Sequence, residues 1–266
     1  MSPTLGRFDY SDDVAAAYDD TRAASASVLR PLRECLAGAP GRRLADVGGG
    51  TGNYAAALRD LDGFEPLVVD VSADMLERAV AKGLATKRGD ARRLPLPDAS
   101  FDAATMMAML HHVPDWRVAL AEARRILVPG GRLAIMGWAA EHAAVFWPLR
   151  YFPASIDWFM DTHPALDEAL AELPGATVTP IVFDDLDDQS LAALSRSPAD
   201  LVRAGRRRET GLFGRMIRDA PAELDAGLDR LERDLAAGAR PHEAPEVMAA
   251  RAERGDAAIL CWTKPR

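Results

Sequence analysis

The chain contains little cysteine and no long hydrophobic run. Its two cysteines, Cys35 and Cys261, lie far apart and show no Cys-x-x-Cys spacing, which argues against a thiolate zinc site and against a disulfide scaffold. No stretch of about 18 apolar residues occurs, so no transmembrane helix is expected. Residues 1–10 lack the basic start and apolar run of a secretory signal. We therefore expect a cytoplasmic protein that does not bind a membrane.

Basic charge is also limited, because 32 lysines and arginines stand against 40 aspartates and glutamates, for a formal net charge of −8. Proteins that bind nucleic acid usually carry a basic stripe that displaces counterions from phosphates. The densest basic run, residues 206–208, is followed by Glu209 and is typical of a solvated helix turn. The composition argues against nucleic acid as a partner.

Metal-binding patterns are missing as well. His142, His163 and His242 are scattered along the second half of the chain, without the spacing that metal ligands usually show. We therefore expect no metal cofactor.

The length of 266 residues suits one large domain, or a core with a modest cap. Apolar residues at roughly helical spacing predict a helical segment within residues 1–40. Strand-like and helical runs alternate over residues 41–138. Residues 139–266 are mostly helical, and two further strand-like runs enclose a cap insertion at about 184–254.

The alternating pattern predicts an α/β protein. We predict strands at 44–47, 66–70, 84–88, 101–109, 132–138, 176–183 and 257–263. We predict helices at 54–61, 74–82, 116–127, 155–173 and 191–235. Nearly continuous apolar strands that alternate with helices imply a parallel sheet covered on both faces. Ligands bind such sheets at the edge where the carboxyl ends of the strands meet.

A glycine-rich turn follows the first predicted strand and opens a helix. Gly48, Gly50 and Gly52 allow a tight turn and a close approach of a ligand to the backbone. Their spacing is G-x-G-x-G, which is one residue shorter than the dinucleotide fingerprint, and Asn53 comes next. Asp70 ends the second predicted strand, where its carboxylate can accept hydrogen bonds from both ribose hydroxyls. This order of elements predicts a nucleotide site.

Five segments of the predicted core occur in one order, at residues 46–52, 69–76, 89–102, 110–113 and 124–133. Together they resemble the class I S-adenosylmethionine-dependent methyltransferases, in the group of the ubiquinone/menaquinone C-methyltransferases and many natural-product methyltransferases. The resemblance implies a Rossmann-like, seven-stranded, mostly parallel sheet of order 3-2-1-4-5-7-6, with helices on both faces and a helical lid. It makes 1–40 a lid segment, 41–138 the cofactor-binding core and 139–266 the part that completes the sheet.

The resemblance also implies roles for individual residues. Asp70 would hold the ribose, Asp90 the adenine amino group, and the glycines the methionine and ribose part of S-adenosylmethionine. The implied cofactor-binding residues are Tyr18, Arg22, Asp46, Gly48, Gly50, Gly52, Asn53, Asp70, Val71, Met75, Asp90, Ala91 and Met107. In the family, an N-terminal tyrosine and arginine close over the methionine end of the cofactor, and Tyr18 and Arg22 stand at these positions. Tyr18 is either one of these closing residues or a buried anchor of the lid helix.

Direct methyl transfer requires alignment of three atoms and exclusion of water, with a base where the acceptor loses a proton. His111 and His112 follow the fourth predicted strand and are the candidate bases. The alternative for one of the two is a structural role or a position beside the cofactor. Aromatic residues gather just beyond the fifth strand and would either bind a flat acceptor or pack the lid. The candidate acceptor-binding residues are Tyr10, Trp138, Phe146, Trp147, Tyr151 and Phe152.

The preferred hypothesis is a methyltransferase for a small aromatic or hydrophobic molecule, acting as a monomer or homodimer. Residues 106–110 differ from the Asn/Asp-Pro-Pro-Tyr/Phe motif of enzymes that methylate exocyclic amines of bases. One alternative is a non-catalytic binder of the cofactor, or a repurposed enzyme of the same fold. An NAD(P)-dependent dehydrogenase is disfavoured, since none of the three lysines follows a tyrosine at Tyr-x-x-x-Lys spacing.

Overall fold

The computed structural model describes residues 24–183, 185, 191–207 and 216–266. Three predicted site residues, Tyr10, Tyr18 and Arg22, lie outside the described residues. The predicted N-terminal lid segment is therefore described only from residue 24. The division of the chain near residues 40 and 138 stays a prediction.

Seven strands form one mixed sheet. They are β1 (Arg43–Val47), β2 (Glu65–Asp70), β3 (Ala85–Arg88), β4 (Phe101–Met107), β5 (Leu127–Gly137), β6 (Thr177–Ile181) and β7 (Ala257–Thr263). Their order is β3-β2-β1-β4-β5-β7-β6, which confirms the predicted order. The strands from β1 to β5 pair in parallel, whereas β7 runs antiparallel between β5 and β6. The carboxyl ends of β1, β2 and β4 therefore meet at one edge.

The helices of the first half of the chain are close to their predicted bounds. They are α2 (Ala26–Leu36), α3 (Asn53–Asp62), α4 (Ala73–Ala81) and α5 (Trp116–Ile126). Short 3-10 turns are η1 (Leu110–His112), η2 (Ala140–Ala144), η3 (Trp147–Tyr151) and η4 (Pro241–Glu243).

The predicted helices of the second half are wrong in their continuity. The observed helices are α6 (Pro153–Thr162), α7 (Leu166–Glu172), α8 (Leu191–Leu194), α9 (Pro198–Arg207), α11 (Pro221–Ala236) and α12 (Pro245–Arg254). Prolines lack the amide that a helix interior needs, so Pro164 follows the end of α6 and Pro198 and Pro221 each begin a new helix. Among the described residues, no helix is both long and apolar enough to cross a membrane.

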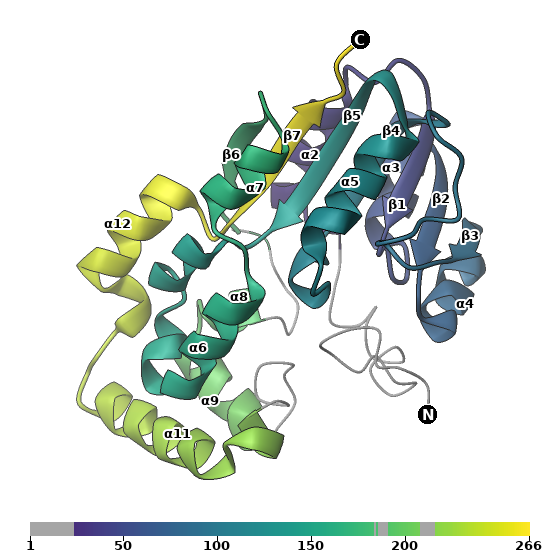
Figure 1. Ribbon diagram of the computed structural model, residues 1–266. Helices are drawn as coiled ribbons and strands as arrows, with labels where there is room; N and C mark the ends of the chain where they lie inside the picture. Colours follow the sequence, from purple (N-terminus) through teal and green to yellow (C-terminus); the bar gives the residue numbers. More distant parts are fainter. Residues whose placement is uncertain (1–23, 184, 186–190, 208–215) are drawn as a thin grey trace.

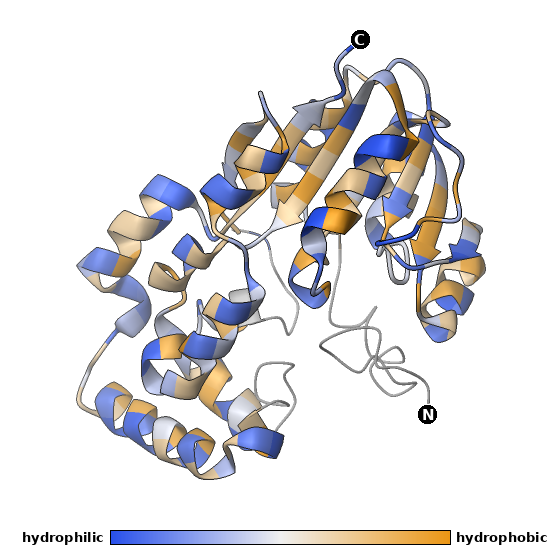
Figure 2. Cartoon of the chain, in the orientation of Figure 1, coloured by the Kyte–Doolittle hydropathy of each residue, from blue (hydrophilic) through white to orange (hydrophobic). Residues whose placement is uncertain are grey.

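The sheet carries the core on both of its faces. All seven residues of β4 are buried, as expected for a central parallel strand. Helices α5 and α7 pack on one face of the sheet, and α2 and α3 pack on the other (Figure 1). The strands are mainly apolar, and the outward sides of these helices are polar (Figure 2). Helices α6, α8, α9 and α11 lie below the carboxyl end of β5 in Figure 1 and enclose a separate apolar cluster.

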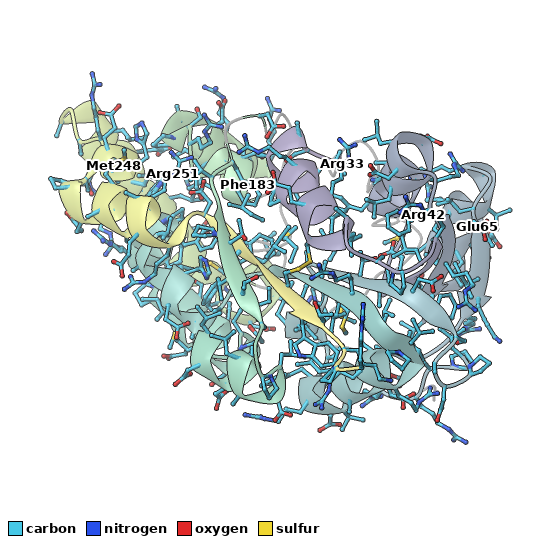
Figure 3. The ribbon with its side chains drawn as sticks, turned by 90° about the horizontal axis from the view of Figure 1, so that it is seen from above. Arg33, Arg42, Glu65, Phe183, Met248 and Arg251 are labelled. Carbon is cyan, nitrogen blue, oxygen red and sulfur yellow. A yellow bond between two sulfur atoms is a disulfide. The ribbon has the colours of Figure 1, made fainter. Side chains whose placement is uncertain are left out.

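Cys35 of α2 and Cys261 of β7 form a disulfide, and their Cα atoms lie 5.6 Å apart (Figure 3). The sequence argued against a disulfide scaffold and gave no sign of this single bond, since the two cysteines are 226 residues apart along the chain. Helix α2 packs across β5 and β7 and removes that separation in space.

A polar clamp fastens α12 to the edge of the sheet. The Arg251 guanidinium donates to the Asp256 carboxylate at 2.8 Å and to the Phe183 carbonyl at 3.2 Å. Asp256 in turn accepts the amide of Phe183 at 2.8 Å. Figure 3 shows Arg251 of α12 beside Phe183, at the end of β6. These contacts fix the position of α12 relative to the start of β7.

Replacing both cysteines, in Cys35→Ser with Cys261→Ser, should lower the free energy of unfolding by about 2–4 kcal/mol, because the bond closes a long loop in the unfolded chain. The measurement is urea denaturation of the oxidised protein and of the double variant. Dithiothreitol should lower the free energy of unfolding of the parent protein and leave that of the double variant unchanged. Two thiols that can be alkylated in the native protein without reductant would contradict the disulfide.

Candidate active site

The turn between β1 and α3 lies at the carboxyl edge of the sheet. Gly48, Gly50 and Gly52 have φ angles of +65°, +56° and +74°. This left-handed region strains residues with a Cβ atom. The backbone of the turn therefore requires glycine at these three positions, as the sequence predicted. The Gly48 amide donates to the carbonyl of Val69 at 2.7 Å and joins this turn to the end of β2.

Close packing adds a second reason for glycine in this turn. A Cβ atom on Gly52 would lie 2.4 Å from Cδ1 of Leu84, which is itself buried beside α4. A Cβ atom on Gly48 would lie 2.9 Å from Cε of Met109, which follows β4. The turn is therefore wedged between the segments that follow β2 and β4.

The Asp70 carboxylate lies against the turn from the end of β2. One of its oxygens accepts the amide of Gly50 at 2.9 Å, and the other accepts the amide of Ser72 at 2.9 Å. Burial raises the pKa of Asp70, and the bonds from Ser72 and Gly50 act in the opposite direction. The structure thus brings together the glycine turn and the predicted ribose-binding acid, which are 20 residues apart in the sequence.

Asp46 lies beneath the turn. Its side chain is 1% exposed and accepts a hydrogen bond of 2.7 Å from the Thr105 hydroxyl of β4. Burial raises the pKa of Asp46 to about 6, against the effect of the Thr105 bond. A Cβ atom on Gly49 would meet the same carboxylate. In this position Asp46 supports the turn from β1 and ties it to β4.

The predicted adenine side has an apolar floor and a charged rim. Met75 is buried at the start of α4, Ala91 is buried in the loop after β3, and Val71 is exposed. The Asp90 carboxylate accepts the guanidinium of Arg92 at 2.7 Å and the Arg92 amide at 2.9 Å. The side-chain bond from Arg92 lowers the pKa of Asp90, so this acid is charged at neutral pH. Arg92 was not among the predicted site residues, although an arginine two residues after an acid in a turn is a recognisable signal.

Lys82 also lies at the site without having been predicted there. Its ammonium donates to the Thr51 carbonyl at 3.0 Å and to the side-chain oxygen of Asn53. The two contacts tie the end of α4 to the start of α3. Through its contact with Lys82, Asn53 helps to hold the turn in position. Nothing in the local sequence indicates that these two residues are in contact.

A strained residue redirects the chain after β4. Ala108 has a φ angle of +51°, a conformation that residues with a Cβ atom rarely adopt, and its amide donates to the Met136 carbonyl at 2.7 Å. Met107 before it is buried at the end of β4. The following turn η1 carries His111 and His112 to the same edge as the glycine turn.

Three imidazoles meet at this edge, because the end of α6 adds His163 to the two predicted histidines. The ring centroids of His111 and His112 lie 3.9 Å apart, and those of His111 and His163 lie 4.7 Å apart in a stacked arrangement. His163 also stacks on Phe159 at 3.9 Å. Burial, with a smaller effect of His163, lowers the pKa of His112 to about 4, so His112 is neutral at neutral pH.

Aromatic rings surround these imidazoles. Trp138 at the end of β5 lies edge-on to His111, with centroids 5.8 Å apart, and 6.3 Å from Phe146. Phe146 lies 5.8 Å from Phe159. A pocket at this edge has mainly apolar walls and is lined by, among others, His111, Trp138, His142 and Pro164. We call the six residues His111, His112, Trp138, Phe146, Phe159 and His163 the ring cluster.

Three further predicted acceptor-binding residues, Trp147, Tyr151 and Phe152, lie outside the ring cluster. Trp147 and Phe152 are buried in the apolar cluster of the helical part, and the Trp147 indole donates to the Ser195 carbonyl at 2.7 Å. The Tyr151 hydroxyl donates to Asp234 of α11 at 2.9 Å. A Cβ atom on Gly227 would clash with Phe152, so α11 packs directly on this ring. These three residues hold the helical part together.

Within the described part of the chain, no three or more histidine, cysteine, aspartate or glutamate side chains are placed to hold a metal ion. Of the remaining histidines, His142 is 2% exposed and its Nδ1 accepts the Ala139 amide at 2.9 Å. This bond holds η2 and places the His142 proton on Nε2.

Comparison with known proteins identifies the family. A methyltransferase domain family matches residues 45–135. A demethylmenaquinone methyltransferase from Beutenbergia cavernae is 32% identical over 179 residues, which are 61% of this chain and 74% of that protein. This chain belongs to the class I S-adenosylmethionine-dependent methyltransferases. The resemblance seen in the sequence is confirmed, and the dehydrogenase alternative is set aside.

Two further proteins extend the comparison of this methyltransferase. A demethylmenaquinone methyltransferase from Deinococcus radiodurans is 37% identical over 123 residues, which are 42% of this chain and 49% of that protein, so the match spans about half of that relative. The crystal structure of a protein from Anabaena variabilis, described as a methyltransferase of an antibiotic biosynthesis pathway, superposes with a TM-score of 0.72. It shares 23% identity over 91% of this chain and 98% of its own, a likeness of fold.

Asp70→Ala should weaken the binding of S-adenosylhomocysteine at least about tenfold, because it removes a charged acceptor of two ribose hydrogen bonds. Isothermal titration calorimetry of the folded variant measures this effect. Asp74→Ala is the matched control, since Asp74 lies a short way further along the chain, in the first turn of α4, and should leave the affinity unchanged. Equal affinities of the two variants would contradict the role of Asp70.

Gly52→Ala should destabilise the protein more than Gly63→Ala. Both glycines have positive φ angles, but a Cβ atom on Gly63 meets nothing within 4 Å, whereas one on Gly52 meets Leu84. We expect a loss of about 1–2 kcal/mol at Gly63 from the backbone, and about 1–3 kcal/mol more at Gly52 from overpacking. Guanidinium denaturation of the two variants compares them, and equal losses would contradict the tight packing of the turn.

Proposed function

We propose that this protein transfers the methyl group of S-adenosylmethionine to a small, flat and largely apolar acceptor. The observation that carries the proposal is the ring cluster, which lies at the same carboxyl edge as the glycine turn and Asp70. Met109 links the two regions, since it touches the turn at Gly48 and immediately precedes η1. The acceptor side of the site therefore adjoins the side that would hold the cofactor.

The residues around the turn fit S-adenosylmethionine. Side chains at Gly48, Gly50 and Gly52 would strain the backbone of the turn or clash with its neighbours. Because these positions carry no side chains, a ligand can approach the backbone there. Asp70 offers two carboxylate oxygens directly beside the turn, where they would accept hydrogen bonds from the ribose hydroxyls. Met75 and Ala91 offer apolar surface for adenine, and Asp90 an acceptor for its amino group.

The sulfonium of the bound cofactor supplies an activated methyl group. The work that remains for the chain is to hold the acceptor in line with that methyl group and to keep water out. Rings with few polar atoms suit both tasks, because they fix a flat molecule by its faces and leave water few partners. Trp138, Phe146 and Phe159 would supply these ring faces.

The relatives support the same class of acceptor. Both named relatives are demethylmenaquinone methyltransferases, and a quinone is a flat apolar molecule. The family match covers residues 45–135, whereas the acceptor side of this chain comes largely from the end of β5 and the helices after it. We therefore propose the class of acceptor, a planar aromatic molecule.

The proposed function is tested by calorimetric titration with S-adenosylhomocysteine, beside NAD and NADP, followed by assays with S-adenosylmethionine and planar acceptors. We expect micromolar binding of S-adenosylhomocysteine alone, and its formation with a naphthoquinol or a phenol such as 1,4-dihydroxynaphthalene. Cofactor binding without turnover across the panel would favour the alternative of a non-catalytic or repurposed protein. Failure to bind at millimolar concentration would contradict the cofactor itself.

A further inference from the structure

The loop that follows β3 carries Asp90 and lies directly beside the end of β2. Gly89, the residue before Asp90, donates its amide to the carbonyl oxygen of Asp70 at 2.9 Å. Asp90 is therefore held next to the acid that would bind the ribose, on the side predicted for adenine. The Asp90 side chain is 29% exposed, so a ligand can reach it.

Arg92 holds the Asp90 carboxylate through both of its oxygens. Oδ1 accepts the Arg92 amide at 2.9 Å and the Arg92 Nε at 3.1 Å. Oδ2 accepts Nη2 at 2.7 Å and Nε at 3.2 Å. The remaining guanidinium nitrogen, Nη1, lies 3.5 Å from an oxygen of Asp115, the residue before α5. A guanidinium fork of this kind determines the plane of a carboxylate, which a single point charge does not.

The loop itself is fastened to α5 by other residues. The Leu94 amide donates to the Glu122 carboxylate at 2.7 Å, and the Arg125 guanidinium donates to the carbonyl oxygens of Leu94 and Leu96 at 3.2 and 2.8 Å. Both leucines are buried in the core beneath the loop. We therefore expect loss of the Arg92 side chain to release the carboxylate and to leave the path of the loop unchanged.

The charge of Asp90 limits the ligand groups that it can bind. Hydrogen bonding to Arg92 lowers the pKa of Asp90, so the carboxylate is ionised at neutral pH and has no proton to donate. Arg92 supplies three N–H donors, and a carboxylate has about four acceptor positions, so one further donor can be received. A ligand amino group is such a donor, whereas a carbonyl oxygen in its place is repelled.

We propose that Arg92 is a positioning residue that holds the Asp90 carboxylate for an amino group of the bound nucleoside, and that the pair thereby selects adenine over a base with a carbonyl oxygen at this place. The inference rests on the proposed function and deepens it by naming what determines specificity for the cofactor. Arg92 acts through Asp90 and takes no part in methyl transfer. Without the fork, the carboxylate can rotate, or take up a proton and donate it to a carbonyl oxygen.

The test compares two ligands by titration calorimetry, S-adenosylhomocysteine and S-inosylhomocysteine, whose base has a carbonyl oxygen in place of the amino group. We expect the parent protein to bind S-adenosylhomocysteine at least about tenfold more tightly. Arg92→Met should lower this ratio at least about fivefold, and it should change the affinity for S-inosylhomocysteine less than about twofold, since that ligand does not use the carboxylate. A merely structural role of Arg92 would weaken both ligands in proportion and leave the ratio unchanged.

Three further variants complete the test. Arg93→Met is the matched control, because Arg93 is the next residue in the chain and is exposed, and it should retain the ratio of the parent protein. Arg92→Lys keeps the charge without the fork and should recover only part of the ratio, and it takes the place of Arg92→Met if that variant does not fold. Asp90→Asn carries an amide that can donate as well as accept, so its ratio should fall to about one.

The outcomes separate this inference from the proposed function. An unchanged ratio in Arg92→Met, or an equal fall in Arg93→Met, would overturn the role of Arg92 and leave the proposed function standing. Equal affinities of the parent protein for the two ligands would overturn selection by the pair, again without touching the proposed function. Failure of the parent protein to bind S-adenosylhomocysteine would contradict the proposed function itself.

Discussion

The hydrogen bond between the Gly50 amide and the Asp70 carboxylate is the contact on which the arrangement of the site depends. It closes the turn after β1 against the end of β2, and it forms only because the turn contains residues that tolerate positive φ angles. Asp46 supports the turn from below through Thr105, and Lys82 ties its far end to α4. Three strands and two helices are thereby held in register around one short loop.

The second half of the chain adds the chemistry that this loop lacks. The end of β5 supplies Trp138, and α6 brings Phe159 and His163 against the turn η1. The backbone strain at Ala108 directs η1 to this meeting point. The clamp between Arg251, Asp256 and Phe183, with the disulfide between α2 and β7, anchors the same half of the chain to the sheet. The ring cluster at the edge of the sheet is thus assembled from several segments that are distant in the sequence.

The sequence predicted the first half of the chain closely, because its signals are local. Strands, helices and the glycine turn follow from apolar runs and from backbone conformations that only glycine adopts without strain. Asp70 was found in the same way, since an acid at the end of the next strand must lie near the turn. The predicted helix over 155–173 failed because apolar periodicity was given more weight than the proline at 164.

Contacts between distant residues were beyond such reasoning. Cys35 and Cys261 are joined because α2 packs across β7, which no spacing along the chain discloses. His163 was judged a scattered histidine, yet tertiary packing stacks it on His111. The sequence by itself determined the family and, through that resemblance, the order of the strands, and it determined the glycine turn, since that turn depends on local backbone geometry. Only the tertiary structure decided which rings and imidazoles meet on the acceptor side, because side-chain packing between remote elements sets those contacts.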